Sequence, residues 1–390
     1  MIAEVGLIVT ISLIIVFSPF IARILSIPTT PVEIILGSLA AYYQLISSDV
    51  HLFETIAEFG FLYLMFIAGT EVNIKEIFKT DTSILKRGIL YLLLLYLLSF
   101  FFAKYLGFSN IFILIMPLIS VGLVASLAKE FGKDMLWIKL SFIIGSLGEV
   151  VSIALLTIAS AVIEFGVGIE FTKALIYLFG FLILVLVLFR SLKILFWWFP
   201  EIGLALMPHR DNKEQDIRLS FALLFIFLAI MLFLDLELAF GAFIAGIFLP
   251  NFFKHKEDLP DKLASFGFGF FIPIFFIYIG SSFDLAALLI DGLVAMAFVI
   301  ANVMILIRIL ASFALYSHLG LKDTFMFAFS HAMPLTLLIA VATLAYQSKS
   351  IDIFHYYAFI LASIFEVIFS MIAIKIISYP PKFLQKFTIK

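Results

Sequence analysis

The sequence is dominated by long, uninterrupted apolar runs. A helix needs roughly 20 apolar residues to cross a bilayer, and polar clusters divide this chain into thirteen runs of about that length or somewhat less. The runs are continuous rather than alternating, so they predict helices and not the strands of a membrane barrel. We expect an all-α polytopic membrane protein with thirteen transmembrane helices. The expected segments are residues 3–22, 31–47, 54–70, 87–106, 110–128, 136–163, 171–199, 217–234, 237–251, 265–283, 288–317, 322–346 and 353–378.

The composition agrees with this class and excludes others. Hydrophobic residues make up 64% of the chain and charged residues only 13%, whereas soluble proteins carry about a quarter charged residues. A net charge of −2 gives no basic patch for a nucleic acid. The absence of cysteine excludes disulfides, thiolate metal sites and cysteine nucleophiles. No HExxH, GxSxG or glycine-rich phosphate loop occurs, so no enzyme is expected.

The distribution of Lys and Arg predicts the orientation. Of the 25 basic residues, we count 21 in the connections after odd-numbered segments and in the C-terminal tail. Only Lys104, Lys173 and Lys349 lie on the opposite side. Cytoplasmic loops are enriched in basic residues, so the N-terminus is expected outside and the C-terminus in the cytoplasm. The first segment has no basic residue before it, unlike a cleavable signal, and we expect an integral protein of the cell inner membrane.

Two pairs of segments resemble each other seven spans apart. FLYLMFIAGTEVNI in the third segment matches FIPIFFIYIGSSFDL in the tenth, with Gly69 on Gly280. LGSLAAYY in the second matches FGAFIAGI in the ninth, with Gly37 on Gly241. An odd separation reverses the orientation of the second copy. Segments 1–6 and 8–13 are therefore predicted to be two inverted six-helix repeats joined by a linker helix, an arrangement typical of secondary transporters.

The fifth and twelfth segments, at matching positions in the two repeats, are both interrupted. Proline removes a backbone donor and leaves a carbonyl free, so we predict two broken helices that cross, although a simple proline kink is the alternative. The interrupting residues are Pro117 and Gly122 in one segment and Pro334 in the other. Polar residues accompany them: Ser120 and Ser126 in the first, and Ser330, His331 and Thr336 in the second.

Three ionisable residues lie centrally within segments: Glu149, Arg308 and Glu366. A charge at the bilayer centre costs about 2.5–3.5 kcal/mol or more, which makes each a functional candidate. An internal ion pair between Arg308 and Glu366 that only holds helices together is the alternative. Glu149 has Gly145 and Gly148 before it, small residues that open space for water or an ion. His331 is either a proton relay or a histidine with a purely structural role.

The motifs together resemble the Kef-type monovalent cation:proton antiporters of the second cation–proton antiporter family. FLYLMFIAGTEVNIKEI resembles their third span, ISVGLVASLAKE their broken helix, and AFGAFIAGIFLPN and FFIPIFFIYIGSSFDL their ninth and tenth spans. LGEVVSIAL lies where they carry the ion-binding acid. The resemblance implies a sodium/proton antiporter-like fold and a homodimer with an elevator-like motion. It implies scaffold helices in 1–83 and 216–287, core helices in 84–164 and 288–390, and a linker in 165–215.

The chain also departs from these relatives. Its sixth span has Gly148-Glu149 where they carry adjacent polar or acidic residues, so one carboxylate remains. Its twelfth span has MPLT, Met333 to Thr336, where they often carry an acid. Kef proteins have a soluble nucleotide-binding regulatory domain after the last span. This sequence ends shortly after the thirteenth segment, so the regulatory nucleotide domain is expected to be absent.

The function expected from these residues is exchange of one Na⁺ or K⁺ for one H⁺, without a cofactor. Glu149 would be protonated and cation-bound in turn, with oxygen ligands from Ser120, Ser126 and Thr336. Arg308 and Glu366 would compensate charge, and the 1:1 exchange would be electroneutral. Two other classes stay open: an organic-anion uniporter or symporter that uses Arg308, and a cation channel.

Overall fold

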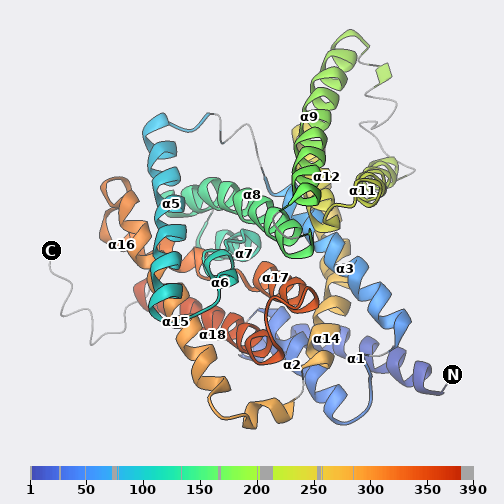
Figure 1. The fold of residues 1–390 in the computed structure, drawn as a ribbon, viewed down its shortest axis with the longest axis vertical. Helices are drawn as coiled ribbons and strands as arrows, with labels where there is room; N and C mark the ends of the chain where they lie inside the picture. The colour runs from blue at the N-terminus through green and yellow to red at the C-terminus, as the bar shows by residue number, and fades with distance from the viewer. Residues whose placement is uncertain are drawn as a thin grey trace. The chain divides into compact units, whose positions relative to one another are not determined.

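The structure, a computed structural model, is helical throughout the part of the chain that it describes (Figure 1). That part comprises residues 2–25, 28–48, 50–72, 77, 79–132, 134–165, 168–199, 201–202, 214–252, 256, 258–283 and 285–378. The all-α prediction is confirmed for these residues.

The helices form two compact units, and each unit combines an early part of the chain with a late part. Unit 1 is Met1–Asn73 with Thr157–Leu289, and unit 2 is Ile74–Leu156 with Ile290–Lys390. Unit 1 contains α1 (Ile2–Leu25), α2 (Thr29–Tyr42), α3 (His51–Thr70), α9 (Ile169–Trp198), α11 (Gln215–Leu234), α12 (Leu238–Phe252), α13 (Leu259–Phe266), the π-helix η1 (Gly267–Phe271), α14 (Ile272–Ser282) and the 3₁₀-helix η2 (Leu285–Leu289). Unit 2 contains α5 (Thr82–Tyr105), α6 (Ile111–Ile115), α7 (Gly122–Phe131), most of α8 (Leu136–Phe165), α15 (Leu293–Ser312), the 3₁₀-helix η3 (Phe313–Leu315), α16 (Tyr316–His331), α17 (Leu335–Gln347) and α18 (Ile353–Ser378).

Many of these helices have the length and composition of membrane spans. Among the described residues, nine helical stretches are long and apolar enough to cross a bilayer, and α12 and α17 are shorter apolar helices. One of the nine, Leu293–His331, contains most of the expected segment 11 and the first part of segment 12. Gly320 separates them, because its φ of 69° and ψ of 177° interrupt α16. The chain is an integral multi-pass membrane protein, and the count of thirteen stays a prediction.

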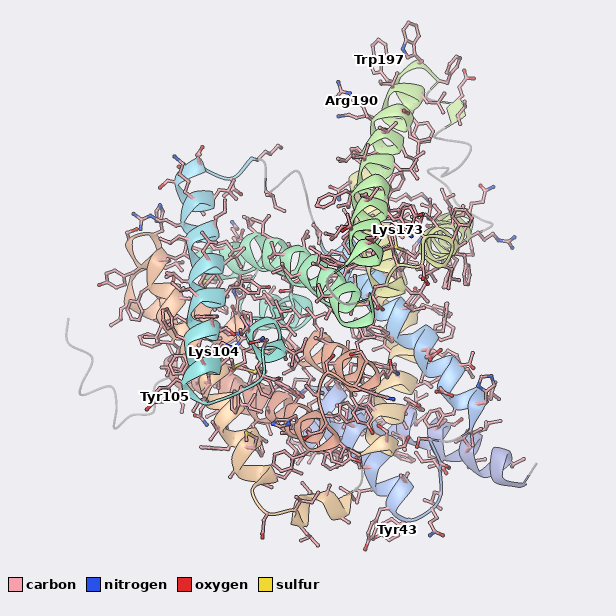
Figure 2. All side chains as sticks on the ribbon, in the orientation of Figure 1. Tyr43, Lys104, Tyr105, Lys173, Arg190 and Trp197 are labelled. Atoms are coloured by element: carbon pink, nitrogen blue, oxygen red, sulfur yellow. The ribbon has the colours of Figure 1, made fainter. Side chains whose placement is uncertain are left out.

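Helix α9 illustrates how polar and aromatic side chains delimit a span. Figure 2 shows Lys173 near one end of this helix and Arg190 and Trp197 toward the other. The residues between Lys173 and Arg190 carry no charge. Trp197 is 76% exposed. Tryptophan and basic residues favour the membrane–water interface, so their positions agree with a helix that crosses the bilayer.

Unit 1 contains two helix crossings in which glycines contact backbone carbonyls of the opposite helix. In the crossing of α2 with α14, Gly37 contacts the carbonyl of Ile277, and Gly280 contacts the carbonyl of Ile34. Ser38 Oγ adds a hydrogen bond to the carbonyl of Gly280 at 2.8 Å. Small residues let two backbones approach closely, and this is the usual packing device of membrane helices.

The crossing of α3 with α12 uses the same device. Gly69 contacts the carbonyl of Phe243, and Gly246 contacts the carbonyl of Phe66. In both crossings each carbonyl belongs to the residue three positions before the opposite glycine. The side-chain amide of Asn251 donates to the carbonyl of Val72 at 3.0 Å, just beyond the end of α3. The two crossings therefore share one contact pattern.

Candidate ion-binding site

The first interruption lies between α6 and α7. Helix α6 ends at Ile115, residues 116–121 are not helical, and α7 begins at Gly122. Pro117 lies inside this break, which we call the first break. Ser120 also lies in it and is 5% exposed. An interrupted helix leaves carbonyl groups without their usual donors, so the first break needs donors from elsewhere in unit 2.

The second interruption lies between α16 and α17. Helix α16 ends at His331 and α17 begins at Leu335, leaving Ala332, Met333 and Pro334 as the second break. Thr336 follows in the first turn of α17. Both interruptions are therefore complete breaks and not bends of a continuous helix.

Arg308 of α15 joins the two breaks. Its Nη2 donates to the carbonyl of Leu118 in the first break at 2.5 Å. Its Nε donates to the carbonyl of His331, at the edge of the second break, at 2.8 Å. Its Nη1 donates to the carbonyl of Met304 on its own helix at 2.6 Å. The planar guanidinium presents several donors in a fixed geometry, which allows one side chain to satisfy carbonyls of both breaks.

Glu366 of α18 supplies the counter-charge to Arg308. The distance between Arg308 Nη1 and Glu366 Oε1 is 3.4 Å, and both side chains are fully buried. Glu366 Oε2 accepts no hydrogen bond from the residues that the structure describes. With its guanidinium engaged by three carbonyls and one carboxylate, Arg308 has little donor capacity left for an organic anion. The bonding of Arg308 thus argues against the anion-transporter alternative.

A hydroxyl group of the first break meets one in the first turn of α17. Ser120 Oγ lies 3.4 Å from Thr336 Oγ1, and either atom can be the donor. The structure therefore brings together two of the three expected hydroxyl ligands. The third, Ser126, belongs to α7, but its side chain lies outside the described part of the chain. Alkali cations are bound by oxygen ligands, and hydroxyl groups are suitable ones.

Glu149 of α8 is fully buried. Two glycines close to it in the sequence, Gly145 and Gly148, allow the first break to pack closely against α8. A side chain in place of Gly148 would contact Ile119, and one in place of Gly145 would contact Val121. Both contact residues belong to the first break. The glycine face of α8 therefore packs directly against the interrupted segment, and Glu149 follows immediately after it in the sequence.

His331 is bonded through both ring nitrogens. Nε2 lies 3.0 Å from the carbonyl oxygen of Ser141, and Nδ1 lies 2.9 Å from the Tyr91 hydroxyl. A carbonyl only accepts, so Nε2 carries a proton. In the neutral ring Nδ1 is the acceptor and the Tyr91 hydroxyl donates to it. Such bonding is typical of a structural histidine.

Three serines of unit 2 that the sequence did not single out bond to the second break or to helices that end at a break. Ser370 Oγ of α18 donates to the carbonyl of Ala332 in the second break at 3.1 Å. Ser141 Oγ of α8 lies 2.7 Å from Ser330 Oγ. Ser99 Oγ of α5 donates to the carbonyl of Ile113 in α6 at 3.0 Å. Single serines within apolar segments are common, so no sequence pattern distinguishes these three.

Unit 2 contains groups whose chemistry suits a small cation and a proton. It combines a buried carboxylate, two adjoining hydroxyl groups and two broken helices whose carbonyls are held by a fixed arginine. Oxygen ligands of this kind suit Na⁺ or K⁺, and a carboxylate also takes up a proton. Binding at breaks within membrane helices is typical of secondary transporters.

Two known proteins are similar to this chain in sequence. The chain is 25% identical over 382 residues, 90% of its length, to YjbQ of Bacillus subtilis, and 28% identical over 236 residues, 58% of its length, to antiporter 3 of Methanocaldococcus jannaschii. Both are named as candidate Na⁺/H⁺ antiporters. The chain spans 59% and 58% of the lengths of these two relatives.

A solved structure shows the same fold. The sodium proton antiporter MjNhaP1 of Methanocaldococcus jannaschii superposes with a TM-score of 0.68, covering 97% of both chains at 16% identity. These matches support sodium/proton exchangers broadly and do not single out the Kef-type branch that the motifs resemble. The model of the transmembrane sodium/hydrogen exchanger family matches residues 9–378. The chain therefore belongs to the sodium/hydrogen exchanger family, whose members are transporters and not enzymes.

Proposed function

We propose that this protein exchanges a monovalent cation, Na⁺ or K⁺, for H⁺ across the inner membrane. The observation that carries the proposal is the buried carboxylate of Glu149 on the helix face that packs against the first break. Membership of the exchanger family and the names of the relatives support the same reaction. Na⁺, K⁺ and H⁺ are then substrates, and no cofactor takes part.

In the proposed cycle Glu149 is protonated and cation-bound in turn. Ser120, Ser126 and Thr336 supply further oxygen ligands to the cation. Arg308 and Glu366 keep the breaks in place and balance each other's charge throughout. Because one carboxylate exchanges one cation for one proton, the exchange moves no net charge and is electroneutral.

The two units support an elevator mechanism. We propose that residues 1–83 and 216–287 are the scaffold, that residues 84–164 and 288–390 are the moving core, and that residues 165–215 link the repeats. The early and late parts combined in each unit agree with this division. A homodimer, an outer N-terminus, a cytoplasmic C-terminus and membership of the Kef-type branch belong to the same proposal. They rest on the Lys and Arg distribution and on the resemblance of the motifs.

The shared contact pattern of the glycine crossings supports the inverted repeats and the count of thirteen spans. Helices α2 and α12 and the broken pair α6–α7 add three spans to the nine stretches. The division of Leu293–His331 at Gly320, with α17 completing the second part, adds the fourth and gives thirteen. If the two repeats are equivalent, the crossing of α2 with α14 corresponds to the crossing of α12 with α3. Gly280 then corresponds to Gly69, as in the sequence match. Gly37, however, corresponds to Gly246. Gly241 packs instead on the side chain of Met231. The alignment of the second segment with the ninth should therefore pair Gly37 with Gly246 and not with Gly241.

Glu149→Gln is expected to abolish exchange, because a neutral amide can neither take up the proton nor neutralise the cation. The measurement uses purified protein in liposomes with an acidic interior and a pH-sensitive dye inside. NaCl, KCl or choline chloride is then added outside. The wild type is expected to release protons with Na⁺ or K⁺ and not with choline. For the salts other than KCl, valinomycin and K⁺ clamp the membrane voltage. Proton release by exchange is then distinguished from proton movement driven by a channel current.

A matched control is available in unit 1. Glu33 is also a buried carboxylate, 5% exposed, and its partner is Ser18 Oγ at 3.4 Å. Glu33→Gln makes the same chemical change outside the proposed site and is expected to retain exchange. Cation-coupled proton release that persists in Glu149→Gln would exclude Glu149 as the shared carboxylate.

Thr336→Val is expected to weaken cation binding without abolishing exchange. Loss of one hydroxyl ligand with little change of volume should raise the apparent KM for the cation about 2- to 10-fold, the equivalent of one hydrogen bond. The KM is measured from initial rates of proton release at increasing cation concentration. Thr172→Val, an exposed threonine at the start of α9, is the control. An unchanged KM in Thr336→Val would remove this residue from the site.

A further inference from the structure

The face of α8 that carries Glu149 also carries the contacts of His331. Residues 141, 145 and 149 are four apart, so they lie along one face of the helix. His331 Nε2 donates to the carbonyl of Ser141 at 3.0 Å. A side chain at Gly145 would approach the same nitrogen to 3.1 Å. His331 therefore packs on α8 one to two turns before Glu149.

The same histidine is fixed to two other parts of unit 2. Its Nδ1 is bonded to the hydroxyl of Tyr91 on α5, and its own carbonyl accepts from Arg308 Nε at 2.8 Å. Tyr91 and His331 are both 0% exposed. The ring of Phe327, one turn earlier on α16, lies 4.3 Å from the imidazole, centroid to centroid. The imidazole thus has one well-defined position between α5, α8 and the end of α16.

We propose that Tyr91, His331 and the Ser141 carbonyl form a positioning bridge that sets the location of Glu149 relative to Thr336, and thereby the affinity for the cation. Thr336 lies five residues after His331, just across the second break, so a shift of the imidazole moves both sides of the site. The proposal deepens the proposed function and rests on it. It assigns a role in cation affinity to Tyr91 and to the Ser141 carbonyl, and makes His331 a positioning residue.

The bonding of the imidazole opposes its use as a proton relay. A relay must hand its proton to a group that can carry it further, and the backbone carbonyl of Ser141 cannot. Tyr91 is the partner at the other nitrogen, and its ring is packed against Phe327 with centroids 5.1 Å apart. A bridge requires no change in the protonation of the ring during transport.

The test compares Tyr91→Phe, His331→Ala and His331→Gln with the wild type in the liposome assay. Tyr91→Phe and His331→Ala are expected to raise the apparent KM for Na⁺ about 3- to 10-fold while the maximal rate stays near the wild-type value. Glutamine places an amide donor near the position of Nε2, where it can still reach the Ser141 carbonyl. His331→Gln is therefore expected to lie between His331→Ala and the wild type.

A pH profile separates the bridge from a relay. Rates are measured between pH 6 and pH 9 at Na⁺ concentrations about ten times each variant's own KM. The bridge predicts that the profile of His331→Ala keeps the wild-type shape. A wild-type KM in both Tyr91→Phe and His331→Ala would overturn the proposal, and so would a lost rate or a displaced profile with an unchanged KM. If His331→Ala does not fold, Tyr91→Phe, which removes a single oxygen, decides the test alone.

The failure of the proposed function has a different signature. If the wild-type protein shows no cation-dependent proton release, or if Glu149→Gln retains it, the exchange mechanism itself is wrong. If the wild type exchanges and Glu149→Gln does not, an unchanged KM in the bridge variants overturns the bridge alone.

Discussion

Arg308→Ala is expected to destabilise the protein by about 3–5 kcal/mol and to abolish transport. Removing one partner of a buried ion pair leaves the other charge uncompensated, and the cost is typically of this size. Here the loss also affects the carbonyls of Leu118 and His331, which accept hydrogen bonds from the guanidinium. The apparent Tm of the purified protein in detergent should therefore fall well below that of the wild type.

Two further variants distinguish the effect of the positive charge of Arg308 from the effect of its hydrogen bonds to the two breaks. Arg308→Lys keeps the positive charge but cannot reach carbonyls of both breaks with one ammonium group. It is expected to be more stable than Arg308→Ala and to transport poorly. Glu366→Gln keeps the bonds from Arg308 to the carbonyls and removes the counter-charge. Arg308→Ala with a wild-type Tm would show that the two breaks do not depend on this side chain.

Gly246→Ala is expected to have the second large effect, on the stability of unit 1. The added methyl group would be forced against the backbone carbonyl of Phe66 and the Cα of Gly69. Overpacking typically costs about 1–3 kcal/mol. Backbone atoms cannot relieve the clash by changing rotamer, as a side chain can. We expect a cost at or above the top of that range, measured as a lower apparent Tm and a smaller yield of folded protein.

Gly180→Ala on α9 is the matched control for this change. A methyl group at Gly180 meets nothing within 4 Å, and alanine is favoured over glycine in a helix by about 1 kcal/mol. Its Tm should equal or exceed that of the wild type. Equal Tm values in Gly246→Ala and Gly180→Ala would contradict the close crossing of α3 with α12.

The sequence predicted the helices and the breaks well because both have local causes. Continuous apolar runs gave the helical segments, and Pro117 and Pro334 indicated the interruptions that the structure contains. The ion pair of Arg308 with Glu366 was one of two alternatives, since a sequence does not show which charges approach each other.

Other parts of the site could not be predicted, because they depend on tertiary contacts. The donors of Arg308 bond to backbone carbonyls, and backbone groups leave no trace in residue identity. Tyr91 and Ser141 lie in apolar segments that contain other tyrosines and serines of no evident role. The residue equivalent to Gly37 in the second repeat could not be predicted either. The ninth segment contains two glycines, Gly241 and Gly246, and only the contact of Gly246 with α3 distinguishes them.

The crossing of α2 with α14 has a consequence for biosynthesis. Helix α2 has 14 residues, fewer than the roughly 20 that cover a bilayer. Its close partner follows far along the chain, as the separation of 242 residues between Ser38 and Gly280 shows. A ribosome must therefore complete well over half of the polypeptide before α2 reaches its final neighbour. Until then α2 lacks its close-packed neighbour, so we expect assembly of this crossing to be a late step of synthesis.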